Sequence, residues 1–144
     1  MKRLNNKGQS LVLFIILIPI FLGIMALVID VGNALSKKNE IDNIIEFVLN
    51  YGLETSEVFF QNKDKEYFNE ELINWKDDLK ILLDYNLEES SNNIILKNNT
   101  ITITSKTYVK GIFSNILNIK GFKIESEYQG YVDMNNKLTT KKIK

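Results

Sequence analysis

The sequence predicts an α+β protein in which a single N-terminal transmembrane helix continues into an amphipathic helix. A second helix and a small antiparallel sheet of about three strands are expected to follow. Two observations predict this fold. The 19 residues from Leu11 to Ile29 carry no ionisable side chain. After Asn92 the spacing of apolar residues changes from three and four to two, which is typical of strands.

The uncharged run has the length of a membrane span. At about 1.5 Å of rise per residue it forms roughly 28 Å of helix, close to the hydrocarbon thickness of a bilayer. A core helix of so small a soluble protein would show a polar face, and the run from Leu11 to Ile29 shows none. A fully buried core helix is one alternative, but the remaining chain is too short and too charged to surround it. A cleaved secretory signal is the other, because Gly32 and Ala34 form a small-x-small pair. The apolar core of such a signal is usually shorter, about 7–15 residues.

Four residues of this segment are candidates for helix packing or a kink. Pro19 removes a backbone donor, which predicts a kink, and Gly23 offers a small-residue surface to a neighbouring helix. Asp30 is expected at the outer membrane–water boundary, because a carboxylate at mid-bilayer is costly. It either marks that boundary only or makes, with Gly32, a polar contact to another helix or subunit. Lys37 is a candidate cation for it in the same chain.

The flanking charges predict the orientation. Lys2, Arg3 and Lys7 precede the helix without an acid beside them, whereas the lysines that follow it are mixed with acids. Because basic residues favour the cytoplasmic side, we expect a single-pass protein of the cell membrane with its N-terminus inside. The predicted divisions are a cytoplasmic leader at 1–9, a transmembrane helix at 10–31, an extracytoplasmic α+β domain at 32–133 and a basic tail at 134–144.

Within the expected outer domain, two apolar stripes predict helices and two alternating segments predict strands. The first stripe continues the membrane helix to about Tyr51–Gly52. The stripes consist of Ile41, Ile44, Ile45, Val48 and Leu49, and of Phe68, Leu72, Trp75, Leu79 and Leu82. Asn98–Asn99 is expected to turn a hairpin from the apolar run 94–96 into a strand at 100–104. A short helical piece at 111–119 and a strand at 122–132 complete the prediction.

Composition argues against several classes of function. The chain contains no Cys and no His, which removes thiol nucleophiles, imidazole bases and the commonest zinc ligands. Between Glu40 and Glu89 there are 14 acidic residues and four lysines, which argues against a nucleic-acid groove. The acidic pairs Asp77–Asp78 and Glu88–Glu89 lack the surrounding loops of a metal or catalytic site. We expect no enzyme, no cofactor and no metal site.

Two stretches of the chain together have the pattern of a known family. The first begins Gly8-Gln9-Ser10, passes Pro19 and ends in Val28-Ile29-Asp30-Val31-Gly32-Asn33-Ala34. The second is looser: Ile101-Thr102-Ile103, then Phe113 and a closing strand. Together they resemble the TadE/TadG-like proteins of the tight-adherence (Tad, or Flp) pilus machinery. Asn33 stands where the family has Arg, and Leu13 stands where processed prepilins carry Glu. The second difference favours the TadG-like branch over a major pilin.

The resemblance implies a non-enzymatic, pseudopilin-like component of a pilus or related secretion apparatus, acting through helix packing. Its partners would be the bilayer, other pilus or pseudopilin subunits and assembly-platform membrane proteins. The resemblance also makes Gly8–Gln9 a candidate processing site, where Leu13 predicts inefficient cleavage or none. The alternative is a membrane-anchored surface protein whose outer domain binds an unrelated partner. An anchored hydrolase that uses the acidic pairs is the third hypothesis.

Overall fold

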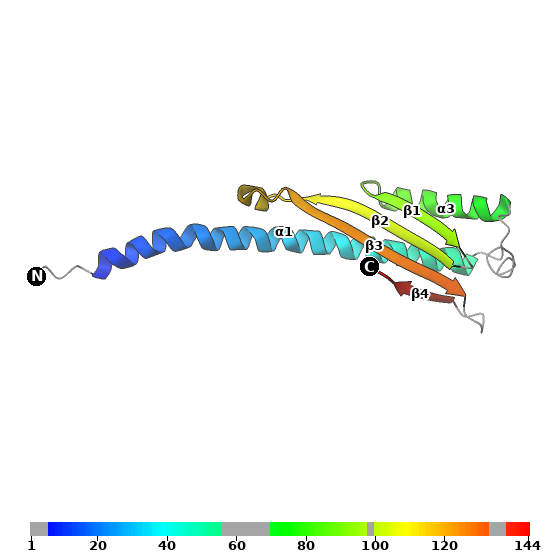
Figure 1. The fold of residues 1–144 in the computed structure, drawn as a ribbon, viewed down its shortest axis with the longest axis horizontal. Coiled ribbons are helices and arrows are strands. Elements are labelled where there is room, and N and C mark those ends of the chain that lie inside the picture. Colours follow the sequence, from blue (N-terminus) through cyan, green and yellow to red (C-terminus); the bar gives the residue numbers. More distant parts are fainter. Residues whose placement is uncertain (1–5, 56–69, 98–99, 133–137) are drawn as a thin grey trace, which may run out of the picture. The chain divides into compact units, whose positions relative to one another are not determined.

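A computed structural model describes residues 6–55, 70–97, 100–132 and 138–144. The element order is α1, α3, β1, β2, the 3-10 helix η1, β3 and β4 (Figure 1). The chain forms two compact units. One consists of Met1–Leu35 with Val109–Phe122, and the other of Ser36–Tyr108 with Lys123–Lys144.

The first element, α1 (Asn6–Thr55), is a single helix of 50 residues. Its helical backbone continues without interruption through Pro19 and Gly32, and the kink at Pro19 stays a prediction. The prediction that the helix extends to about Tyr51–Gly52 is confirmed. At its end the Thr55 hydroxyl donates a hydrogen bond to the Tyr51 carbonyl at 2.7 Å, which satisfies one of the last carbonyls of the helix.

The C-terminal half of α1 supplies much of the core of the second unit. Its fully buried side chains follow one helical face. They are Ile41, Ile45, Val48, Leu49 and Leu53. The first predicted stripe is therefore confirmed, except that Ile44 lies at its edge and is only half-buried. Burial of this stripe, rather than helix propensity, stabilises this half of the helix.

The second helix, α3 (Glu70–Asn86), is confirmed, but its buried face differs from the predicted one. Leu79, Leu83 and Leu87 are buried, whereas Leu82 is half-buried. The spacing of four brings Leu83 onto the same face as Leu79, and the next residue at this spacing, Leu87, lies just past the helix end. The predicted Phe68 lies outside the described residues, and nothing is described of the side chain of Leu72. At Gly52 of α1, an added Cβ would lie 2.7 Å from the Leu79 methyls, so the two helices pack closely there.

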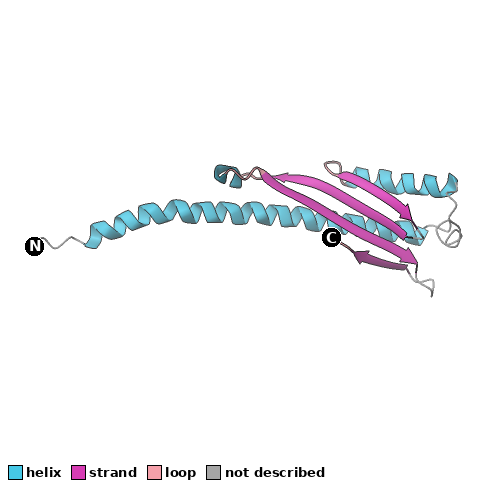
Figure 2. Ribbon diagram, in the orientation of Figure 1, coloured by secondary structure: helices cyan, strands magenta, loops and turns pink. Residues whose placement is uncertain are grey.

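The strands form one antiparallel sheet in the order β1-β2-β3-β4 (Figure 2). They are β1 (Ser91–Lys97), β2 (Thr100–Lys110), β3 (Gly121–Val132) and β4 (Leu138–Lys142). The predicted hairpin is confirmed by the pairing of Lys97 with Thr100 in β1 and β2, although its turn at Asn98–Asn99 lies outside the described residues. The sheet has four strands rather than about three.

The fourth strand comes from the segment that we expected to be a basic tail at 134–144. Leu138–Lys142 pairs antiparallel with β3, from Val132↔Leu138 to Tyr128↔Lys142. Its two threonines are β-branched and favour an extended chain. Lys142 also forms an ion pair with Asp42 of α1. These contacts with residues distant in the sequence order the segment, and no local pattern predicted them.

One face of the sheet is covered. Buried residues alternate with partly exposed ones along β2 and β3, as in an antiparallel sheet with one solvated face. The buried positions are Ile101, Ile103 and Ser105 in β2 and Ile124, Ser126, Tyr128 and Gly130 in β3. A Cβ on Gly130 would lie 2.8 Å from a Leu53 methyl and 2.9 Å from a Leu49 methyl. The helix therefore packs directly on the backbone of β3.

Candidate functional site

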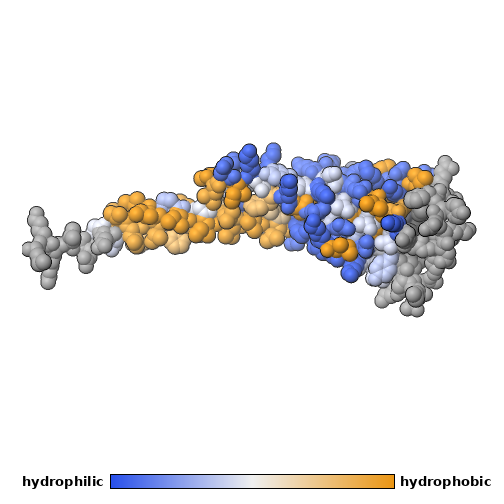
Figure 3. All heavy atoms as spheres, in the orientation of Figure 1, coloured by the Kyte–Doolittle hydropathy of each residue, from blue (hydrophilic) through white to orange (hydrophobic). Residues whose placement is uncertain are grey.

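The N-terminal half of α1 exposes its apolar side chains. Within the described residues, it holds one segment long and apolar enough to cross a membrane, by length and composition, and none of that segment is buried. Figure 3 shows the apolar surface around this half of the helix. The exposed large side chains are Leu11, Val12, Leu13, Phe14, Ile15, Ile16, Ile18, Ile20, Phe21, Leu22, Ile24, Met25, Val28, Ile29 and Val31. So large an apolar surface is typical of a membrane or protein contact.

Asp30 is the exception on this half of the helix, because its side chain is only 2% exposed. Its Oδ2 accepts hydrogen bonds from two backbone amides, that of Phe113 at 2.9 Å and that of Ser114 at 2.6 Å. Both amides belong to the connection between β2 and β3, here named the β2–β3 tip (residues 111–120). A buried carboxylate needs such donors, and charge-assisted bonds of this kind are the stronger ones.

Several backbone hydrogen bonds join residues within the tip. The Gly111 amide donates to the Lys120 carbonyl at 3.1 Å and closes its base. Inside it lies η1 (Ser114–Leu117), which ends at Asn118 with φ 63°. Asparagine tolerates this left-handed conformation better than most residues. The Asn118 amide then donates to the Asn115 carbonyl at 3.0 Å.

Gly111, the first residue of the tip, has no space for a side chain, chiefly because of the Ser114 hydroxyl. A Cβ on Gly111 would lie 3.2 Å from Asp30 Oδ2 and 3.1 Å from the Ile119 carbonyl, and it would overlap the Ser114 hydroxyl. That hydroxyl in turn donates to the Ile119 carbonyl at 3.3 Å. Glycine at position 111 therefore lets the two amides reach the carboxylate.

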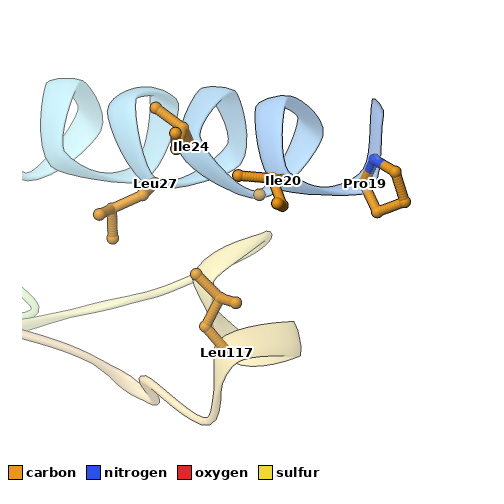
Figure 4. A pocket seen from close by; sticks show the side chains of 6 residues that line it. Pro19, Ile20, Ile24, Leu27 and Leu117 are labelled. Atoms are coloured by element: carbon orange, nitrogen blue, oxygen red, sulfur yellow. The ribbon is translucent and has the colours of Figure 1, made fainter. Parts of the chain in front are cut away.

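Large apolar side chains are exposed on the outside of the tip, beside those of Asn115, Asn118 and Lys120. Its exposed large side chains are Ile112, Phe113, Ile116, Leu117 and Ile119. Leu117 faces α1 across an open hollow of about 410 Å³ (Figure 4). The other lining residues all come from the helix: Pro19, Ile20, Gly23, Ile24 and Leu27. The hollow has no charged group in its lining, so it suits an apolar chain or side chain.

The structure brings three of the four predicted packing residues toward the tip. Pro19 and Gly23 line the hollow, and Asp30 binds the tip's amides. Gly32 is exposed, and a Cβ there would meet no atom within 4 Å. The prediction that Lys37 is the cation for Asp30 is wrong, because its ammonium pairs with Glu40 at 3.0 Å.

The candidate processing site lies at the start of α1. Gly8 and Gln9 both have helical backbone. Gly8 is exposed, and a Cβ there would meet no atom within 4 Å. Nothing is described of the side chain of Gln9. Whether the chain is cleaved between them stays a prediction.

The acidic pairs lie on the surface. Asp77, Asp78, Glu88 and Glu89 are all exposed. Among the residues that the structure describes, no group of three or more carboxylates could hold a metal ion.

A second buried carboxylate on α1, Asp42, contacts the end of the chain. It forms an ion pair with Lys142, which raises the pKa of that lysine. The Lys142 ammonium also lies 5.8 Å from the centre of the Tyr128 ring. Nearby, the Lys144 and Lys106 ammonium groups hydrogen-bond Glu125 and lower its pKa to about 2.

Sequence reasoning missed the partners of both buried carboxylates. The donors to Asp30 are backbone amides, which leave no mark in residue identity. Lys142 lies 100 residues from Asp42, in a segment without an apolar pattern. Comparisons of the chain with family models, with curated proteins and with solved structures find no match. The resemblance to the TadE/TadG-like proteins stays a prediction.

Proposed function

We propose that this protein is a single-pass, membrane-anchored and non-enzymatic assembly component. It is a minor pseudopilin-like or TadG-like subunit of a Tad/Flp-type pilus or a related secretion apparatus. Its apolar helix packs with the helices of other subunits and of assembly-platform proteins in the cell membrane. One observation carries the proposal: the same continuous helix exposes an apolar N-terminal half and contributes its C-terminal half to the core of a folded α+β unit.

This division of one helix supports assembly over catalysis. An anchor alone needs only an apolar span, and a flexible linker to the folded unit would suffice. Here the span continues without a break into the buried stripe at Ile41–Leu53. A partner that binds the exposed half of α1 therefore binds the same helix that forms much of the core of the folded unit. The absence of Cys and His from the sequence adds support, because it removes thiol nucleophiles and imidazole bases.

The orientation is part of the proposal. Lys2, Arg3 and Lys7 keep the N-terminus in the cytoplasm, and the α+β unit lies outside. Because the chain has no natural cysteine, single cysteines can report this directly. Exposed Glu88→Cys and Lys97→Cys should react with a membrane-impermeant thiol reagent on intact cells, whereas Asn5→Cys should react only after lysis. The opposite pattern would refute the orientation.

Assembly is tested by purification of sheared surface fibres and of membrane complexes. The protein should co-purify with fibre subunits or platform proteins. Gly32→Leu adds bulk where no atom of the chain lies within 4 Å of the new Cβ, so loss of co-purification would come from a partner. Val28→Leu, on the same helical face, is the matched control and should co-purify normally. A correctly oriented protein without such partners would instead support the anchored surface protein that binds an unrelated partner.

A further inference from the structure

We propose that the β2–β3 tip (residues 111–120) inserts into the lipid leaflet beside α1 and forms a second membrane contact. The apolar side chains of the tip contact the headgroup and upper acyl region of the bilayer that α1 crosses. This inference rests on the part of the proposed function that makes α1 a membrane span. It does not depend on the identity of the pilus partners.

Five of the exposed side chains of the tip are large and apolar, beside the exposed polar side chains of Asn115, Asn118 and Lys120. Ile116 at its outer end is 83% exposed, and Ile112, Phe113, Leu117 and Ile119 are exposed around it. Connecting loops normally carry polar residues at such positions, because they face water. A cluster of apolar residues on a short loop marks a contact with an apolar phase or a partner.

The place of the tip along α1 gives its depth. Leu117 shares a hollow with Gly23 and Leu27, while the amide of Phe113 binds Asp30. If the span ends near Asp30, a rise of about 1.5 Å per residue puts the helix residues that line the hollow, from Leu27 to Pro19, roughly 5–16 Å below that level. The shallower part of this range is the depth at which interfacial apolar side chains insert, about 5–10 Å into the headgroup and acyl boundary.

More than half of the backbone N–H groups of the tip have acceptors within the protein. Backbone N–H groups in lipid must have acceptors in the protein, because each unsatisfied one costs several kcal/mol. Six such groups in the tip have acceptors: those of Gly111, Phe113, Ser114, Ile116, Asn118 and Ile119. Asp30 accepts two of them. The carboxylate therefore satisfies the amides that insertion would otherwise leave without water.

Charge around the tip suits the phosphates of lipid headgroups. Lys110 and Lys120 bracket the apolar residues at its base, and both are exposed. No acidic residue lies between Val109 and Phe122. Long lysine side chains reach the headgroup level while neighbouring apolar side chains enter the acyl region.

The test uses the full chain in lipid vesicles, with an environment-sensitive fluorophore on single cysteines. The tip is labelled at Ile116→Cys. Met25→Cys on the apolar half of α1 reports the span, and Ile81→Cys on α3 is the exposed control outside it. Lipids that carry a nitroxide on the acyl chain quench a nearby label. We expect strong quenching at positions 25 and 116 and little at position 81.

The failures of the two proposals are distinguishable. If the label at position 25 is quenched but the label at position 116 is as weakly quenched as the control at position 81, α1 spans the bilayer and the tip does not insert. That result would overturn the proposal of an inserted tip and leave the span intact. A blue-shifted label at 116 that lipid nitroxides do not quench would mean that protein covers the tip, which also overturns the proposal. Absence of quenching at 25 and 116 would remove the span itself and, with it, both proposals.

The charge argument has its own test in the same vesicles. Replacing part of a neutral phosphatidylcholine with anionic phosphatidylglycerol should increase quenching at position 116. The double variant Lys110→Gln/Lys120→Gln should lose this increase. Lys97→Gln removes an exposed lysine at the end of β1, outside the tip, and should keep the increase in quenching. An increase that survives the double variant would refute the role of these two lysines.

Discussion

A matched pair of substitutions on α1 tests whether its two halves have different surroundings. Ile45 is 0% exposed in the core of the α+β unit, whereas Ile24 is 55% exposed on the apolar half. Truncating a buried isoleucine to alanine removes apolar contacts and leaves a cavity, which costs about 2–5 kcal/mol. Ile24→Ala should change the stability of the α+β unit little, because its side chain would face lipid whether that unit is folded or unfolded.

The assay is urea unfolding of the full chain in lipid vesicles, followed by tryptophan fluorescence. Trp75 in α3 is the chain's single tryptophan and reports the α+β unit. With a urea dependence of about 2 kcal/mol per M, the middle of the usual range, a loss of about 2–5 kcal/mol in Ile45→Ala should lower the unfolding midpoint by about 1–2.5 M. Ile24→Ala should leave the midpoint within error of the parent.

Two results would refute this reasoning. Equal loss of stability in both variants would mean that the N-terminal half of α1 is buried against protein, so the helix would not be a bare span. An unchanged midpoint for Ile45→Ala would mean that the stripe on the C-terminal half does not hold the α+β unit together. Phe47→Ala, an exposed position beside the stripe, is a control for truncation in general.

Three other substitutions test particular contacts. Asp30→Ala should speed hydrogen exchange at the backbone amides of Phe113 and Ser114, which donate to the carboxylate. Asp77→Ala, which removes an exposed carboxylate, should leave their exchange unchanged. Equal protection of the two amides in both variants would refute the contact. Glu125, whose pKa the Lys144 and Lys106 ammonium groups lower from 4.5 to about 2, should contribute stability that is present above pH 4.5 and lost as pH falls toward 2. Glu125→Gln should therefore be less stable than the parent at neutral pH, and this difference should vanish near pH 2 in thermal unfolding. Gly130→Ala forces a Cβ against leucine methyls of α1 and should destabilise the α+β unit by about 1–3 kcal/mol in the same measurement, and an unchanged melting temperature would show that the helix can move away.

Features that depend on local periodicity could be predicted from the sequence. The uncharged run and the stripe after it predicted one long helix, and α1 indeed runs from Asn6 to Thr55. Alternating threonine and isoleucine at 100–104 predicted a strand, and β2 contains it. In each case the pattern repeats with the period of the backbone, so that a few residues suffice to identify the element.

Features that depend on distant partners could not be predicted. The segment that forms β4 has no alternating apolar pattern, and its order comes from pairing with β3 and from the contact of Lys142 with Asp42. On α3, the choice between Leu82 and Leu83 for the buried face depends on where the helix meets its neighbours. At a spacing of three or four, both residues fit a helical stripe with Leu79. Only packing decides between them.

The two buried carboxylates of α1 show why position along the helix determines the kind of partner. Asp30 and Asp42 are both buried, and each binds a segment more than 80 residues away. Asp42, in the α+β unit, has a cation, Lys142, whose side chain is 44% exposed. Asp30, at the expected membrane boundary, has two backbone amides instead. An amide partner loses less on leaving water than an ammonium group does, so it suits a tip that enters the leaflet.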